Sequence, residues 1–100
     1  MTAADAQRVD KWLWHARLAR TRSAAQRLAL SGHVRINREK VKAASRLVHR
    51  GDVLTVALGR GVRVLRVVGF AERRGSFEDA RRLYEDQAGT AAPPSPAVDI

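Results

Sequence analysis

The side chains best suited to binding chemistry in this sequence are arginines and lysines, and they are concentrated in its first half. Residues 8–50 hold twelve Lys and Arg against two acidic residues, a formal balance of +10, whereas residues 51–100 hold seven of each kind. Guanidinium groups donate paired hydrogen bonds that match phosphate oxygens, and a local excess of positive charge favours a polyanionic partner. The distribution therefore predicts nucleic-acid binding by the first half, in preference to a merely solvated surface on an arginine-rich protein.

The sequence shows no clear pattern of catalytic or metal-binding residues. The three histidines are scattered, and no two of them have the four-residue spacing of a helical metal motif. There is no cysteine, which excludes disulfides and thiolate ligands. The acidic residues between 78 and 86 fit the capping and solvation of a helix, and the glycines at 59 and 61 fit a hairpin turn better than a phosphate loop. We therefore expect no catalytic residue, no metal site and no cofactor.

The length and the hydropathy pattern favour one small domain. One hundred residues fit a single domain. No run of about 18 apolar residues is present, and the amino-terminal stretch MTAADAQRVD is polar, so neither a membrane span nor a signal peptide is expected. We expect a cytoplasmic protein with no membrane partner that is monomeric when free.

Two amphipathic helices are expected at the start of the basic half. The first is predicted to begin at Lys11 with Asp10 as its N-cap, to bury Trp12, and to end near residues 18–20. The second is predicted to be capped by Thr21, with Ser23 and Gln26 as a rival capping box, and to stop at a left-handed glycine at position 32. Basic side chains on the outer faces of both helices would then share one surface.

A small sheet is expected after the helices. Alternating apolar residues predict strands over residues 34–36, 53–58 and 62–70, with turns over residues 37–40, 50–52 and 59–61. A helix is predicted over residues 76–87, capped by Ser76. Residues 1–7 are expected to be a flexible amino terminus, and residues 88–100, rich in Ala and Pro, a disordered tail. The fold class is thus α+β, with two amino-terminal helices packed on a small, mainly antiparallel sheet, plus a carboxy-terminal helix.

The order of these features resembles the αL RNA-binding domain first seen in ribosomal small-subunit protein four. The resemblance covers residues 8–58, with residues 59–87 extending the same domain by a strand and a helix. It rests on a set of matching residues: Arg8, Asp10, Lys11, Thr21, Arg22, Gly32, Val34, Ile36, Asn37, Val41, Lys42, Gly51 and Asp52.

Two further stretches, DKWLWHARL and ERRGSFEDARRLYED, resemble the bacterial heat-shock protein 15 family. That resemblance implies a stress-response protein that binds ribosomal RNA of the large subunit. It also implies a role in recycling or quality control of stalled large subunits that still carry a nascent chain on transfer RNA. The RNA-binding positions that it implies are Arg8, Lys11, Arg17, Thr21, Arg22, Ser23, Gln26, Asn37, Lys40 and Lys42. For Arg8, an interaction with Asp10 that fixes the start of the first helix is a rival role.

Several alternatives stay open at this point. The chain could be an RNA-binding accessory subunit of an RNA-modifying enzyme, a general nucleic-acid-binding domain that also takes DNA, or a module for acidic proteins. Trp14 could stack on an unpaired base instead of joining the core. The sequence has Arg38 where an Asn-Gly turn is usual in the family, and because a side-chain-bearing residue disfavours positive φ, we expect a turn longer than two residues.

Overall fold

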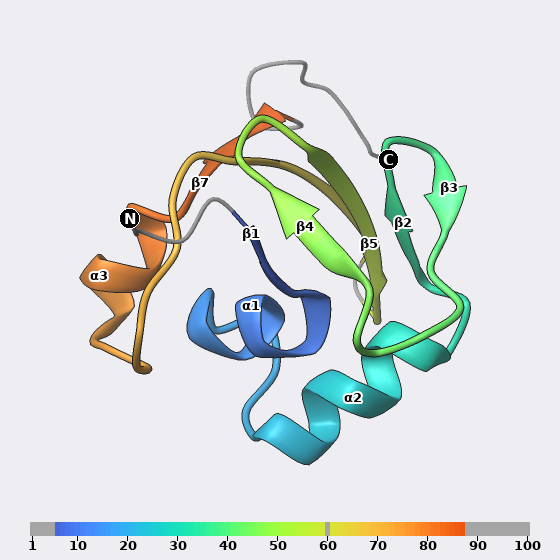
Figure 1. Ribbon diagram of the computed structural model, residues 1–100, viewed down its shortest axis with the longest axis horizontal. Helices are drawn as coiled ribbons and strands as arrows, with labels where there is room; N and C mark the ends of the chain where they lie inside the picture. The colour runs from blue at the N-terminus through green and yellow to red at the C-terminus, as the bar shows by residue number, and fades with distance from the viewer. Residues whose placement is uncertain (1–5, 60, 88–100) are drawn as a thin grey trace.

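The computed structural model describes residues 6–59 and 61–87 and confirms an α+β fold. Five strands form an antiparallel sheet in the order β3-β2-β5-β6-β7, and β1 pairs with β4 in a second, two-stranded sheet. Helices α1 and α2 lie together below the strands, and α3 lies at one end (Figure 1). The elements are β1 (Ala6–Arg8), α1 (Val9–His15), α2 (Arg22–Leu30), β2 (Val34–Ile36), β3 (Glu39–Lys40), β4 (Leu47–His49), β5 (Val53–Leu58), β6 (Gly61–Val67), α3 (Phe77–Arg81) and β7 (Tyr84–Asp86).

Helix α1 is shorter than the sequence pattern predicts and begins earlier. It begins at Val9, with Arg8 in the N-cap position and no side-chain cap. The first amides of the helix donate hydrogen bonds to backbone carbonyls of the loop before β4, and not to a capping carboxylate. The Val9 N–H donates to the Arg46 carbonyl at 2.7 Å. The helix ends at His15 because Arg17 adopts φ +62°, which a right-handed helix cannot accommodate. The predicted end at residues 18–20 is therefore wrong.

Helix α2 has the predicted capping. The Thr21 hydroxyl accepts a hydrogen bond from the Ala24 amide at 3.0 Å, so Thr21, and not Ser23, is the N-cap. Gly32 follows the helix with φ +88°, the left-handed conformation expected there. Ala25 and Ala29 are fully buried, and their small side chains allow the helix to pack closely, mainly against α1.

The hairpin between β2 and β3 corrects the expectation of a longer turn. Ile36 pairs with Glu39, so only Asn37 and Arg38 form the turn, with φ +51° and +77°. Positive φ at both central residues is the mirror-type turn that suits the twist of a hairpin. The Asn37 side chain stabilises it, because its Nδ2 donates to Asp52 and its Oδ1 accepts from the Val53 amide, both at 3.0 Å.

Strands at both ends of the described chain were missed. Residues 6 and 7, predicted to be flexible, belong to β1, where Gln7 pairs with Val48. The predicted helix over residues 76–87 stops at Arg81, although Ser76 and Asp79 form the capping box at its start. Residues 84–86 then join the sheet as β7 beside β6, held by a 2.8 Å ion pair between Arg63 and Asp86. The predicted tail, residues 88–100, lies outside the described residues, as do residues 1–5.

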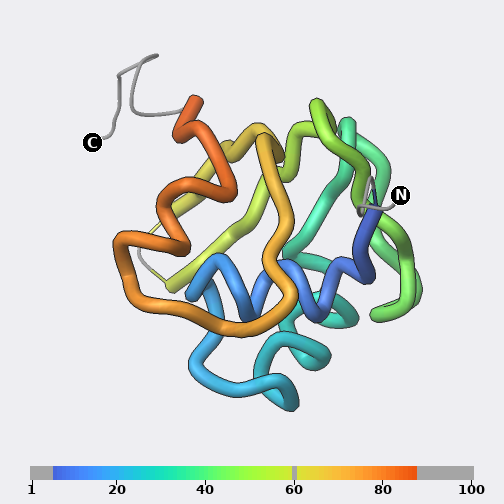
Figure 2. Tube along the Cα trace, turned by 60° about the vertical axis from the view of Figure 1, so that its left-hand side comes forward, coloured from blue at the N-terminus to red at the C-terminus, as the bar shows by residue number. Residues whose placement is uncertain are grey.

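The core lies between the helices and the strands. Trp12, Leu13, Leu54 and Leu65 are fully buried there. The segment after β6 runs beside α1, as Figure 2 shows, and the Trp12 indole N–H donates to the Gly69 carbonyl at 3.1 Å. Strand β6 ends at Val67, three residues before the predicted end, which leaves residues 68–75 to cover this helix.

Candidate nucleic-acid interface

One buried carboxylate organises the basic residues where α1 and α2 begin. Asp10 is completely buried, and its two oxygens accept hydrogen bonds from Arg8 Nε at 3.1 Å and Arg8 Nη2 at 3.0 Å. Arg22 Nη2, from the first turn of α2, lies 3.5 Å from the same carboxylate. The Lys11 amide also donates to it, at 2.7 Å. We call Arg8, Asp10 and Arg22 the Asp10 cluster.

The Asp10 cluster keeps a net positive charge at the surface. Burial alone would raise the pKa of Asp10, but the hydrogen bonds from Arg8, the charge of Arg22 and the Lys11 amide lower it below its usual value. Asp10 is therefore an anion facing two cations. The side chains of Arg8 and Arg22 remain 46% and 38% exposed, so both keep part of their surface in contact with solvent.

The structure gives Arg22 a different setting from the one the helical pattern suggested. The pattern placed it on an open outer face of the second helix. In the structure its Nε is buried and donates no hydrogen bond within the described residues, and its Nη2 lies 3.5 Å from the Asp10 carboxylate. A negative side chain at this position would face a buried carboxylate, so Arg22→Glu would disturb the fold as well as any binding surface.

The other predicted positions on α2 are open to solvent. Ser23 and Gln26 are exposed, and within the described chain their side chains make no hydrogen bond. Thr21 is exposed too, but its hydroxyl oxygen is engaged as the N-cap. Arg27, which the motif did not select, is equally exposed on this helix.

Arg17 lies apart from the Asp10 cluster. Its Nε and Nη2 donate to the Gly75 carbonyl at 3.0 and 2.8 Å, so it contacts the loop before α3. There it lines a separate hollow with Arg63 and Phe77. The resemblance placed Arg17 with the helix-one cations, whereas the turn at the end of α1 directs it to the opposite end of that helix.

The hairpin positions divide into two kinds. Lys40 and Lys42 are exposed cations, and Lys40 extends across Gly32, where an added Cβ would lie 3.1 Å from its Cε. The hairpin therefore adjoins the end of α2. The Asn37 carboxamide, by contrast, is bonded at both ends inside the protein. Its geometry suits the shaping of the turn.

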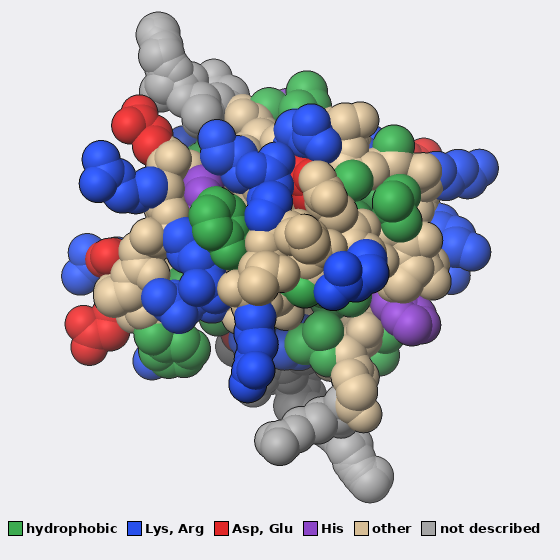
Figure 3. Space-filling model, turned by 90° about the horizontal axis from the view of Figure 1, so that it is seen from below, with side chains coloured by type: hydrophobic (Ala, Val, Ile, Leu, Met, Phe, Trp, Pro, Cys, Tyr) green, Lys and Arg blue, Asp and Glu red, His purple; other side chains and the backbone are tan. Residues whose placement is uncertain are grey.

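Figure 3 shows the face on the side of α1 and α2. Lys and Arg side chains are spread across this face, and acidic side chains lie mainly toward one edge. Trp14 is not a free platform here, because it is packed against the core and Arg74 lies 5.8 Å over its ring. Arg74 was missed by the sequence reasoning; it also donates to the Trp14 carbonyl in the last turn of α1 and to the Ala19 carbonyl after this helix.

Residues 6–59 and 61–87 offer neither a metal site nor a membrane-spanning helix. No group of three or more His, Asp or Glu side chains in these ranges could hold a metal ion. No helix in the same ranges is both long and apolar enough to cross a bilayer.

Comparisons with known proteins agree with this arrangement. Residues 7–54 match the S4 domain, an RNA-binding domain. The chain is 33% identical over 79 residues to the heat shock protein 15 homolog of Haemophilus influenzae and 36% identical over 81 residues to heat shock protein 15 of Escherichia coli strain K12. These alignments cover 79% and 81% of this chain, and the chain spans about 60% of the length of either relative.

A solved structure supports the same relationship. Heat shock protein 15 of Vibrio cholerae, solved as a trimer, superposes with a TM-score of 0.77 at 31% sequence identity, over 84% of each chain. A structural match of this extent, at this identity, covers both the S4 region and the strands and helix that follow it. The chain therefore belongs to the heat shock protein 15 family and carries an S4 domain.

Proposed function

We propose that this chain binds structured RNA through the face formed by α1, α2 and the β2–β3 hairpin. The observation that carries the proposal is the Asp10 cluster, in which a buried carboxylate holds two partly exposed guanidinium groups side by side. Groups held in this way lose less side-chain entropy when they bind a phosphate. Arg8 and Arg22 would contact phosphate oxygens, with Lys11 beside them.

The other proposed residues have graded roles. Ser23, Gln26, Lys40 and Lys42 are exposed and would contact the RNA backbone directly. Thr21 and Asn37 would position the helix and the turn, since their side chains are bonded within the protein. Arg17 would contribute at the far end of α1. Because an A-form duplex hides its base edges in a deep, narrow groove, shape and phosphate contacts would dominate.

The finer role that we propose is in translation. Membership of the heat shock protein 15 family supports large-subunit ribosomal RNA as the target, in recycling or quality control of stalled large subunits that carry nascent chain-tRNA. A cytoplasmic location and the absence of catalysis belong to this proposal. The free chain would be a monomer, and light scattering checks this against the trimer of the Vibrio cholerae relative.

Binding to an RNA hairpin at several salt concentrations tests the proposal. If about five phosphates are neutralised, log affinity should fall with log salt at a slope of roughly −3.5 to −4.5. Arg22→Gln should weaken binding about tenfold or more. Arg66→Gln is the matched control, because Arg66 is exposed on β6 between the buried Leu65 and Val67, and so points away from the helices. A slope near zero, or equal effects of both variants, would contradict the proposed interface.

Co-sedimentation with ribosomes tests the finer role. The protein should travel with free large subunits in a sucrose gradient at low and moderate salt. If the protein stays at the top of the gradient, or binds all RNA and duplex DNA equally, the role at the large subunit is contradicted. The general nucleic-acid-binding domain is then the alternative that stands. Association with an RNA-modifying enzyme instead would favour the accessory-subunit alternative.

A further inference from the structure

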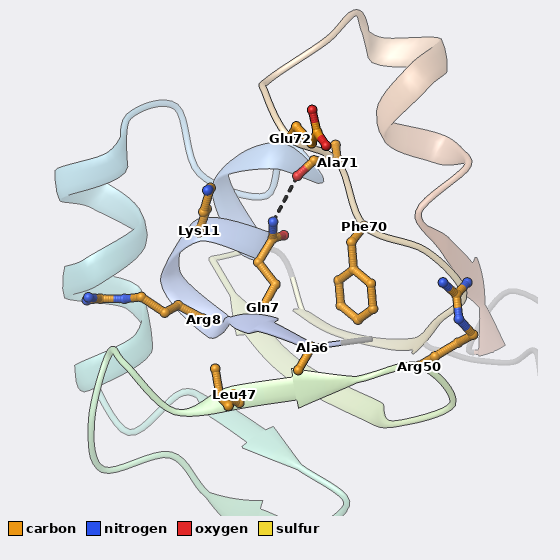
Figure 4. Close-up of a pocket in the computed structure, with 9 residues that line it drawn as sticks. All are labelled: Ala6, Gln7, Arg8, Lys11, Leu47, Arg50, Phe70, Ala71 and Glu72. Atoms are coloured by element: carbon orange, nitrogen blue, oxygen red, sulfur yellow. Dashed lines mark hydrogen bonds between the residues drawn. The ribbon is translucent and has the colours of Figure 1, made fainter. Parts of the chain in front are cut away.

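A hollow of about 580 Å³ lies at one edge of the candidate interface, between β1, the segment from Leu47 to Arg50 and residues 70–72 (Figure 4). Arg8 and Lys11 line it on the side of the interface. Arg50 and Phe70 line it on the other side, and the ring of Phe70 points into the space between β1 and Arg50 (Figure 4). Its volume lies within the range of about 300–1,000 Å³ that is usual for small-ligand sites.

Hydrogen bonds across the chain hold the walls of this hollow in place. Gln7 is nine-tenths buried, and its Nε2 donates to the Ala71 carbonyl at 2.8 Å, which ties the segment after Phe70 to β1. Arg50 donates to the Val68 carbonyl, and the Trp12 indole donates to that of Gly69. Both neighbours of Phe70 are thus anchored, so the ring is presented by a fixed backbone.

The lining combines an aromatic ring with cations. The guanidinium of Arg50 lies 5.7 Å from the centre of the Phe70 ring, and Phe70 is only partly buried. Among the described lining residues, three are cations, Arg8, Lys11 and Arg50, and one is acidic, Glu72. An aromatic face beside several cations recognises an unpaired base joined to phosphate, because the ring stacks on the base and the cations neutralise the backbone. An apolar protein side chain would leave these charges without partners.

We propose that this hollow receives one unpaired nucleotide of the bound RNA. Its base stacks on Phe70, with Arg50 completing the stack, and its phosphate contacts Lys11. The proposal rests on the RNA-binding function proposed above and adds to it. The chain would then hold the backbone of a helical region on α1 and α2 and a bulged or flanking nucleotide in the hollow.

Two RNA hairpins with the same paired sequence test the nucleotide pocket. One is fully paired, and the other carries in addition a single bulged 2-aminopurine. The wild-type protein should bind the bulged hairpin at least about fivefold more tightly, which corresponds to the lower end of a base–aromatic stack, ~1 kcal/mol. The 2-aminopurine fluorescence should fall on binding, because stacking quenches it. Phe70→Leu keeps an apolar side chain but removes the ring, so it should abolish the preference and leave affinity for the paired hairpin unchanged.

Phe77→Leu is the matched control, because Phe77 is 61% exposed and has Arg81 5.9 Å over its ring, outside the hollow. It should keep the preference. Arg50→Lys, which retains the charge without the planar group, should reduce the preference for the bulged hairpin. If thermal unfolding shows that Phe70→Leu is not folded, Arg50→Lys provides the test in its place.

The outcomes separate the two proposals. Equal wild-type affinity for the two hairpins would overturn the nucleotide pocket while leaving the RNA-binding function standing. Loss of preference in Phe77→Leu, or an equal loss for both hairpins in a folded Phe70→Leu, would also overturn the pocket. Failure of the wild type to bind either hairpin would instead overturn the proposed function.

Discussion

Replacing Asp10 by Asn should destabilise the protein strongly, although it changes only one atom. The carboxylate is completely buried, accepts three hydrogen bonds and lies between two cations. An asparagine turns one acceptor into a donor that faces the Arg8 guanidinium. Breaking a buried ion pair costs about 3–5 kcal/mol. Because Arg8 and Arg22 remain 46% and 38% exposed, solvent relieves part of that cost, and we expect about 2–3 kcal/mol.

The expected loss is large enough to measure by thermal unfolding. For a domain of about 100 residues, each 1 kcal/mol lowers the melting temperature by roughly 4–8 °C. Asp10→Asn should therefore lower it by about 8–24 °C. Glu39→Gln is the matched control, because Glu39 pairs with Arg46 at 3.2 Å but is 73% exposed. Its loss should stay within about 1 kcal/mol.

The same substitution should change the dependence of stability on pH. The pKa of Asp10 is lower in the folded protein than the usual value of 3.8. Its stabilising effect is therefore fully present above about pH 3.8 and is lost as the pH falls through the lowered folded pKa. In Asp10→Asn this part of the acid-induced loss should disappear from urea unfolding curves recorded across the acid range.

A double-mutant cycle with Arg8→Gln tests the cause of the effect. If the Asp10 cluster acts as a unit, the two changes should be non-additive by about 1 kcal/mol or more. Additive effects, or an Asp10→Asn variant within about 0.5 kcal/mol of wild type, would refute the view that this carboxylate organises the helix starts.

Three further substitutions probe single features of the fold. His15 is buried with neither ring nitrogen bonded within the described chain, and burial, then the charge of Lys11, lowers its pKa below 6.5. The free energy of unfolding should therefore fall as the pH drops below about 6.5. His15→Phe should reduce this dependence on pH in melting curves recorded from pH 5 to 8. Thr21→Ala removes the N-cap of α2 and should cost about 1 kcal/mol, whereas an unchanged melting temperature would show that the cap is dispensable. Arg38→Gly relieves a positive φ of +77° and should stabilise the hairpin by about 0.5–1 kcal/mol in urea unfolding, and a loss of stability would contradict the strained turn.

Elements with strong local signals could be predicted from the sequence. Thr21 and Gly32 bracket α2, and residues 53–58 form β5 with the predicted bounds. Strands β1 and β7 could not be predicted, because their residues, AQR and YED, show no alternation of apolar side chains and pair with strands distant in sequence. The local sequence RRLYEDQ favours a helix that continues through residue 87. In the structure, pairing with β6 outweighs this local preference.

The candidate site shows the same division between local and distant information. The exposure of Ser23 and Lys42 follows from their places outside the apolar pattern. The interaction of Asp10 with Arg8 at the start of α1 was among the predicted alternatives and is present in the structure, but the contact of Asp10 with Arg22 depends on how α1 and α2 pack. The environment of Phe70 could not be predicted from local sequence, since β1, β4 and the segment after β6 all contribute to it.

The arrangement of charge explains why one acid matters among so many basic residues. Two adjacent guanidinium groups repel each other, and without a counter-charge they would separate or add to the cost of folding. Asp10 offsets that repulsion from within the protein, so Arg8 and Arg22 keep their outer donors for a ligand. Arginine suits this double role because its fork can bond the carboxylate on one edge and a phosphate on another, which the single ammonium of lysine cannot do in the same geometry. Lysine at both positions would therefore keep the net charge of the interface but lose the fixed spacing between its two cationic groups.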